Sequence, residues 1–388
     1  MKTEKLQLPL QTSSLIVGFM VWVIISSLMP HIRTDIALTP GQVSLVTAVP
    51  VILGSLLRIF IGFWTNRFGA RWLFTISFFI LMFPIYFISI ADSFIDLIIG
   101  GLFLGIAGAV FSIGVTSLPK YYPKEKHGFI NGIYGSGNIG TAITSFAAPV
   151  LAAGFGWRSA VRMYIVLVFI FALLNLIFGD RREPRVQTSF TRQWKEIYRE
   201  TRMWFLSLFY FITFGSFVAF TVYLPNFLVE HFHLEPVDAG LRTAGFIVLA
   251  TAMRPLGGWL ADKFDAFVIL VYVFSGITLA GALLAFSPSL ALYTAGVLTI
   301  ALCAGIGNGT VFKLVPLYFT KQAGIVNGIV SAVGGLGGFF PPLVLAAVKD
   351  LTGQYAIGFM ALSEFALASL IIVIFMYYRE KQRLQLGE

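Results

Sequence analysis

The chain has 388 residues, of which 57% are hydrophobic and only 12% are charged, with a mean hydropathy of +0.86. Soluble domains carry about 25% charged residues, so this composition excludes an ordinary soluble protein and predicts a membrane protein with several spans. The net charge of +9 would suit nucleic acid or anionic lipid, and the positions of the charges decide between these uses. The single cysteine, Cys303, excludes an internal disulfide and argues against a thiolate metal site. We expect neither a metal nor a cofactor.

The apolar segments have the length of helices that cross a bilayer. A hydrocarbon core about 30 Å thick requires roughly 20 apolar residues per helix. Twelve segments meet this requirement, which predicts an all-α membrane protein with twelve transmembrane helices. The expected spans are 13–29, 42–65, 72–91, 95–118, 129–152, 159–179, 203–229, 239–261, 266–287, 289–318, 324–348 and 355–378.

Basic residues are divided unequally between the two sides of these spans. Nineteen of the 27 Lys and Arg residues fall in loops on the side of the N-terminus, and five, among them Lys349, fall on the other side. The positive-inside rule therefore predicts a multi-pass protein of the cell membrane with both termini in the cytoplasm. The basic charge then reflects topology, so the expected surroundings are the lipid bilayer and no nucleic acid partner is needed.

The longest predicted loop is residues 180–202. It carries Phe190, Trp194 and Tyr198 at intervals of four residues among basic side chains, as an amphipathic helix at a membrane interface does. We interpret it as a cytoplasmic linker between an N-terminal six-helix bundle, 1–179, and a C-terminal six-helix bundle, 203–388. A site for a regulatory partner on the linker is the alternative.

Two runs rich in glycine and asparagine, 128–140 and 324–338, occupy matching places in the two halves. Glycine costs a water-exposed helix roughly 1 kcal/mol relative to alanine, but between membrane helices small residues allow close approach and asparagine finds partners across the contact. The residues expected in such contacts are Asn131, Gly132, Gly135, Gly137, Gly140, Asn327, Gly328, Gly334, Gly335 and Gly337.

One constant offset, 196 residues, relates the two runs and other positions as well. It relates Asn131 to Asn327 and Arg58 to Arg254. Two parallel, pseudo-symmetric six-helix bundles would produce this register, and transporters built in this way bind substrate near the bilayer midplane between the halves. Channels and membrane enzymes rarely have this layout.

Arg58 and Arg254 each lie about 12 Å inside a predicted span, at 1.5 Å per residue. Burying an arginine there costs at least about 2.5–3.5 kcal/mol. An ion pair with a buried acid is the structural interpretation, but Glu364 is the only acid well inside a span and cannot neutralise both. The functional interpretation is that the two guanidinium groups bind an anion. The planar fork of donors on each guanidinium group suits nitrate, nitrite or a carboxylate. Phosphate and sulfate would match the positive charge of such a site better than its planar shape.

Residues 62–71, with the sequence GFWTNRFGAR, resemble the loop motif between the second and third helices of the major facilitator superfamily. Asn66 stands where that motif usually has Asp, whereas Asp262 keeps the acid in the second half. Together with the two glycine runs and the two arginines, the chain resembles the nitrate/nitrite porter family of that superfamily over nearly its whole length. The resemblance implies the major facilitator fold.

The resemblance also implies roles for single residues. Phe111 and Phe214 match rings that stack on the anion, and the hydroxyl of Tyr210 matches one that contacts it. Asn138 matches the motif that lets its helix rock close to the site, and we expect it to bind the substrate as well. Gly137, Gly334 and Gly335 match a motif that lets their helices rock near the site, and Asn308 lies in a related motif. Ordinary packing is the alternative for each phenylalanine and for Asn138. We expect Lys313 to extend to the aqueous boundary.

Two positive charges that bind one monovalent anion favour the exchange of one anion for another. The protein should close less readily around an empty site of charge +2 than around a loaded site of charge +1. We therefore expect nitrate uptake in exchange for nitrite by alternating access, in a monomer. Proton-coupled nitrate symport, through Tyr210, Glu364 or water, is the alternative. A porter for small organic anions and a nitrate sensor are further alternatives. An enzyme is not expected, since no Ser/His/Asp set, metal cluster or nucleotide loop lies at membrane depth.

Overall fold

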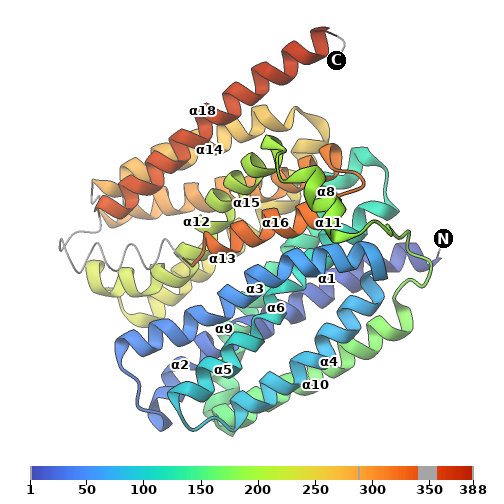
Figure 1. The fold of residues 1–388 in the computed structure, drawn as a ribbon. Helices are drawn as coiled ribbons and strands as arrows, with labels where there is room; N and C mark the ends of the chain where they lie inside the picture. The colour runs from blue at the N-terminus through green and yellow to red at the C-terminus, as the bar shows by residue number, and fades with distance from the viewer. Residues whose placement is uncertain (1, 287–288, 340–355, 387–388) are drawn as a thin grey trace. The chain divides into compact units, whose positions relative to one another are not determined.

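A computed structural model describes residues 2–286, 289–339 and 356–386, which form helices and turns without a strand (Figure 1). Eleven helical segments in this part of the chain are long and apolar enough to cross a membrane. The predicted eleventh span, 324–348, begins with α16 (Ala323–Leu336) and is described as far as residue 339. Residues 340–348, like 287, Lys349 and 355, lie outside the described residues. The prediction of an all-α membrane protein is confirmed.

The helices follow the predicted spans closely, and most extend them by a few residues. They are α1 (Lys2–Trp22), α2 (Ile24–Asp35), α3 (Pro40–Phe68), α4 (Ala70–Ser89), α5 (Phe94–Leu104), α6 (Ile106–Ala109), α7 (Phe111–Ser117), α8 (His127–Gly135), α9 (Ile139–Phe155), α10 (Trp157–Phe178), α11 (Phe190–Ile197), α12 (Thr201–Phe232), α13 (Pro236–Lys263), α14 (Ala266–Ala285), α15 (Leu290–Tyr318), α16 (Ala323–Leu336) and α18 (Ala356–Leu386).

Three of the predicted spans are interrupted. The first is divided at Val23 into α1 and α2, and the fourth is divided at Gly105 and Val110 into α5, α6 and α7. The fifth changes from α8 to the 3₁₀ turn Ser136–Asn138 before it continues as α9. A 3₁₀ segment inside a helix is a typical place for a bend, and this one contains Asn138.

The chain forms two compact units. Unit 1 comprises Met1–Pro123, Ile133–Arg199 and Phe319–Ala332, and unit 2 comprises Lys124–Gly132, Glu200–Tyr318 and Val333–Glu388. The start of the fifth span thus groups with the second half of the sequence, and the start of the eleventh span groups with the first half. The bundles 1–179 and 203–388 remain predictions.

Clear start and stop signals define α3, the helix that carries Arg58. Thr39 and Gln42 form a capping box at its start, where each side chain bonds to the backbone N–H of the other. Gly69 ends the helix with φ of 87°, a backbone conformation that glycine adopts without strain. Helix α4 then starts at the next residue, so a single glycine separates the two helices.

The predicted linker contains a short helix, α11. Its first residue, Phe190, packs against α3 in unit 1, with ring centroids 5.9 Å from Phe60 and 5.3 Å from Phe63. Trp194 and Tyr198 stack on each other with centroids 6.4 Å apart. Of the aromatic residues that indicated an amphipathic helix, Phe190 therefore attaches α11 to α3.

Candidate functional site

Arg58 on α3 is fully buried in unit 1. Its Nε donates to the carbonyl oxygen of Gly108 at 3.1 Å, and its Nη1 donates to that of Ser331 at 2.7 Å. The guanidinium carbon lies 5.4 Å from the centroid of the Phe111 ring. Cation–π attraction contributes about 0.5–2 kcal/mol and, with the two hydrogen bonds, offsets part of the cost of burying the charge.

Arg254 on α13 is fully buried in unit 2 and also faces aromatic rings. Its Nη2 lies 3.1 Å from the hydroxyl oxygen of Tyr210, and its guanidinium carbon lies 5.8 Å from the Phe214 centroid. The Tyr210 and Phe214 rings are stacked with centroids 5.0 Å apart, while Phe312 meets Tyr210 edge-on at 4.7 Å. The predicted Arg254, Tyr210 and Phe214 therefore form one cluster, as Arg58 and Phe111 do in unit 1.

Glycines bring a second helix against the backbone of each arginine. A Cβ atom on Gly328 of α16 would lie 2.6 Å from the carbonyl oxygen of Arg58. A Cβ atom on Gly132 of α8 would lie 2.6 Å from the carbonyl oxygen of Arg254. These distances are shorter than real Cβ contacts, so only glycine allows the two approaches. Residues separated by 196 positions thus make the same contact in each unit.

The two related asparagines bond across these same contacts. Asn131 donates to the carbonyl oxygen of Phe312 at 3.0 Å in unit 2. Asn327 donates to the carbonyl oxygen of Val115 at 3.1 Å in unit 1. Both side chains are buried and join helices, as the sequence predicted for asparagine in a glycine-rich contact.

The other predicted glycines contact neighbouring helices inside each unit. In unit 1, Gly137 and Gly140 lie against Leu15 and Ile16 of α1. In unit 2, Gly334 and Gly337 lie against Tyr210 and Phe211 of α12. Gly135 ends α8, and the carbonyl oxygen of Gly335 accepts from the N–H of Gly338 at 2.9 Å.

All four predicted asparagines carry buried side-chain atoms without a hydrogen-bond partner among the described residues; in Asn131 and Asn327 this atom is Oδ1. Neither side-chain polar atom of Asn138 has a hydrogen-bond partner among the described residues, and the same holds for Oδ1 of Asn308. Both residues are almost fully buried. An unsatisfied buried amide costs about 1–3 kcal/mol, so such a position calls for an explanation such as a ligand or water.

The Lys313 side chain extends toward the end of α13 and the turn before α8, where specific partners hold it. Its Nζ binds Oδ1 of Asp262 at 2.6 Å and the carbonyl oxygen of Lys124 at 2.5 Å, all within unit 2. Asp262 also accepts from the backbone N–H of Gly128 at 3.0 Å and of Phe129 at 2.7 Å. The acid thus stabilises the start of α8, where the helix dipole favours a negative charge, and it holds Lys313 in place.

The corresponding position in unit 1, Asn66, has no charge, and its amide lies against the backbone of Gly324. A carboxylate from the linker, that of Glu183, instead accepts a hydrogen bond at the turn between α3 and α4. Glu183 accepts from the N–H of Ala70 at 2.7 Å and pairs with Lys120 at 2.9 Å. Glu364 is exposed on α18, so it does not point into a buried proton site. Among the described residues, no group of three or more His, Cys, Asp or Glu is placed to hold a metal.

Several contacts of the candidate site had no signal in the sequence. The carbonyl oxygens of Gly108 and Ser331 belong to the backbone, and any residue type could supply them. Ser112 and Ser331, which bond through their hydroxyl oxygens at 3.0 Å, are 219 residues apart. The edge-on Phe312 is one of 39 phenylalanines.

Comparisons with known proteins give matches that cover nearly the whole chain. A family model described as the Major Facilitator Superfamily matches residues 12–342. The nitrite extrusion protein of Bacillus subtilis is 67% identical over 380 residues, which cover 98% of this chain and 96% of that protein. A Staphylococcus epidermidis protein named "Probable nitrate transporter NarT" is 51% identical over 381 residues, 98% of each chain.

Two solved structures show the same fold. The human organic anion transporter MFSD10 matches with a TM-score of 0.80 over 95% of this chain and 99% of its own. The Escherichia coli fucose:proton symporter FucP matches with a TM-score of 0.76 over 96% of this chain and 99% of its own. Each is 14% identical, so these likenesses concern the fold alone.

Proposed function

This chain belongs to the major facilitator superfamily, and we propose that it is a transporter that carries nitrate and nitrite across the cell membrane by alternating access. The names of the Bacillus and Staphylococcus relatives support these substrates. The structural observation that carries the proposal is the repeated pair of a buried arginine and a phenylalanine ring, Arg58 with Phe111 and Arg254 with Phe214.

This pair suits a small planar oxyanion. A guanidinium group presents its N–H donors in one plane, which matches the oxygens of nitrate or nitrite, and an aromatic ring can lie against the flat face of such an ion. We propose that both arginines, both phenylalanines, Tyr210 and Asn138 bind the substrate. Asn308 and Asn327 are secondary candidates, while Gly132, Gly135, Gly137, Gly140, Gly328, Gly334, Gly335 and Gly337 allow the helices to move during transport.

Charge favours exchange of nitrate for nitrite. Two guanidinium groups that serve one site repel each other more strongly as water leaves, because the attraction and repulsion of charges grow as the dielectric constant falls. An anion lowers that repulsion, so the loaded transporter changes conformation more readily than the empty one. Proton symport is the alternative; the exposure of Glu364 disfavours this acid as its proton carrier. We further propose that both termini lie in the cytoplasm and that the protein acts as a monomer of two six-helix bundles.

The decisive experiment measures nitrate uptake into proteoliposomes that contain either nitrite or inert buffer, each with and without an inward proton gradient. Exchange requires internal nitrite and is insensitive to the gradient. Accumulation driven by the gradient alone would establish symport. Excess formate or acetate should compete weakly with nitrate, whereas strong competition would favour a carboxylate porter.

Lysine at either arginine position tests the site itself. We expect Arg58→Lys and Arg254→Lys each to reduce uptake at least 100-fold, because an ammonium group cannot replace a planar fork of donors. The matched control is Arg242→Lys on the same helix as Arg254, where an exposed arginine pairs with Asp238 at 3.0 Å and lysine can keep the pair. Substantial uptake by either buried-site variant, at normal amounts in the membrane, would contradict the assignment.

A further inference from the structure

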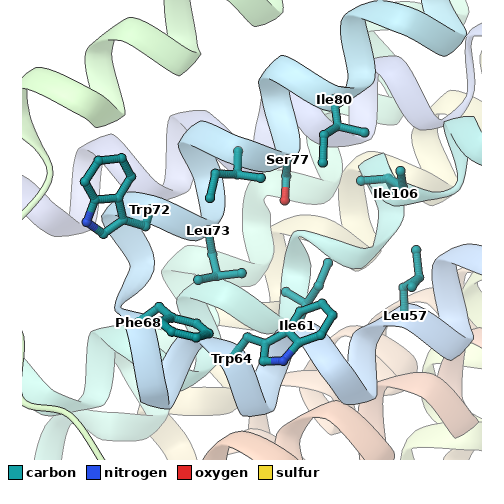
Figure 2. A pocket seen from close by; sticks show the side chains of 10 residues that line it. Leu57, Ile61, Trp64, Phe68, Trp72, Leu73, Ser77, Ile80 and Ile106 are labelled. Carbon is teal, nitrogen blue, oxygen red and sulfur yellow. The ribbon is translucent and has the colours of Figure 1, made fainter.

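Unit 1 contains an apolar groove between α3 and α4 with a volume of about 540 Å³ (Figure 2). Its lining is hydrophobic except for Ser77, and five of its residues are between 42% and 48% exposed, so the groove opens on the outer surface of the unit. The lining residues are Leu57, Ile61, Trp64, Phe68, Trp72, Leu73, Ile76, Ser77, Ile80 and Ile106. The volume lies in the range of ligand sites, about 300–1,000 Å³.

The length of the groove corresponds to one leaflet of a bilayer. Eleven residues separate Leu57 from Phe68 on α3, which is about 16 Å at 1.5 Å per residue. The hydrocarbon core is about 30 Å thick, so one leaflet is about 15 Å. Figure 2 shows Trp64, Phe68 and Trp72 at the end next to the α3–α4 turn and Leu57, Ile80 and Ile106 toward the other end. Aromatic rings at one end and aliphatic chains at the other match the change from interface to hydrocarbon.

Two arginines stand at the aromatic end. The guanidinium carbon of Arg67 lies 5.6 Å from the ring centroid of Phe68, and that of Arg71 lies 5.0 Å from the ring of Trp72. Both rings line the groove. Nε of Arg71 donates to the carbonyl oxygen of Leu176 at 2.9 Å, which fixes the side chain in this place. The exposed Arg67 and the fixed Arg71 thus put positive charge where a lipid headgroup would lie.

From these observations we propose that the groove between α3 and α4 binds one anionic phospholipid, with an acyl chain along the groove and its phosphate at Arg67 and Arg71. The groove opens on the surface of unit 1, whereas Arg58 is buried, and the proposal does not depend on the transported substrate. Phosphatidylglycerol has the required chemistry, a single net negative charge on a headgroup joined to two acyl chains.

The corresponding turn in unit 2 provides a natural control. Lys263 takes the place of Arg67, and its Nζ lies 4.2 Å from the Trp259 centroid. Asp265 takes the place of Gly69 and caps α14 by accepting from the N–H of Phe267 at 2.8 Å. An acid beside the lysine weakens the attraction for a lipid phosphate. Lys263→Gln therefore removes the same charge as Arg67→Gln from a turn in which Phe267 stands in the place of Arg71.

The experiment titrates the full-length protein, purified in detergent and stripped of lipid, with phosphatidylglycerol or phosphatidylcholine of identical acyl chains. Native mass spectrometry gives the dissociation constant of the first bound lipid. A basic residue near a membrane surface changes the affinity for an anionic lipid about fivefold. We expect Arg67→Gln to weaken binding of phosphatidylglycerol about fivefold, Arg67→Gln/Arg71→Gln about 30-fold, and Lys263→Gln less than twofold. Binding of phosphatidylcholine should be the same in all of these variants.

Filling the groove tests the place of the acyl chain. Ile80→Trp replaces a partly exposed residue at the aliphatic end, so the variant should fold, and we expect it to weaken the binding of both lipids at least tenfold. Equal affinity of the unmodified protein for the two lipids would overturn the proposal, as would unchanged lipid binding by Ile80→Trp. A dimer that Ile80→Trp dissociates would also overturn it, because a second copy would then occupy the groove. If the double variant does not fold, the exposed Arg67→Gln alone decides the role of the headgroup.

Discussion

Tyr210→Phe removes one oxygen atom from the most completely described part of the candidate site. The hydroxyl oxygen lies 3.1 Å from Nη2 of Arg254, and both side chains are buried. The tyrosine ring is held independently of the hydroxyl, since it stacks on Phe214 at an interplanar angle of 7° and meets Phe312 edge-on. Phenylalanine can therefore keep the packing and lose only the polar contact.

A hydrogen bond to a charged group contributes about 1.5–3 kcal/mol. If the hydroxyl helps Arg254 to hold the anion, Tyr210→Phe should raise the nitrate concentration for half-maximal uptake by about 10- to 100-fold, with little change in the amount of folded protein. The assay is initial uptake into proteoliposomes across a range of nitrate concentrations, accompanied by a thermal unfolding measurement in detergent.

Tyr164→Phe is the matched control. Tyr164 is also buried, and its hydroxyl lies 3.0 Å from Oγ1 of Thr144 in unit 1, neither of which belongs to the candidate site. It should lose a similar amount of stability while keeping the affinity for nitrate. If both variants bind nitrate within twofold of the unmodified protein, the hydroxyl of Tyr210 is not part of the anion site and the reasoning fails.

The remaining predictions concern the contacts on either side of the arginines. Gly132→Ala and Gly328→Ala should each slow uptake at least tenfold and lower stability by about 1–3 kcal/mol, because the new methyl group meets a backbone carbonyl; Gly154→Ala, whose added Cβ meets nothing within 4 Å, should be neutral in the same assays. Asp262→Asn should destabilise the protein by about 1.5–3 kcal/mol, because the amide cannot replace the ion pair with Lys313 or both bonds to the start of α8. An unfolding temperature equal to that of the unmodified protein would show that this carboxylate is dispensable.

Hydropathy and repeat analysis predicted the helices well because a membrane span has a strong and simple signal. The interruptions were not predicted, since an apolar window responds in the same way to an α-helix and to the 3₁₀ turn Ser136–Asn138. Gly105 illustrates what an apolar window does not contain, namely which residues lie next to each other in space. It stands where α3 packs closely, and an added Cβ would lie 2.5 Å from the carbonyl oxygen of Pro50, a neighbour 55 residues earlier.

The candidate site was predictable where its residues are chemically rare and repeat. Arginine inside an apolar span is conspicuous, and the 196-residue offset pairs Arg58 with Arg254. For Lys313, the distance from the end of the helix predicted the direction in which the side chain extends, but not its partner Asp262, which is 51 residues away in the sequence. The lipid groove left no sign in the sequence, as its lining looks like any other membrane-facing surface.

Although the repeat makes the two arginines equivalent in position, their hydrogen-bond acceptors differ in kind. Arg254 donates to a side-chain hydroxyl of α12, whereas Arg58 donates to the main chain of α16 at Ser331. An anion that draws the Arg58 fork toward itself competes directly with that carbonyl, so substrate occupancy and the attachment of α16 to α3 are thermodynamically linked through one side chain. At the proposed site, binding of an anion to Arg58 would therefore be accompanied by a weaker contact between α3 and α16.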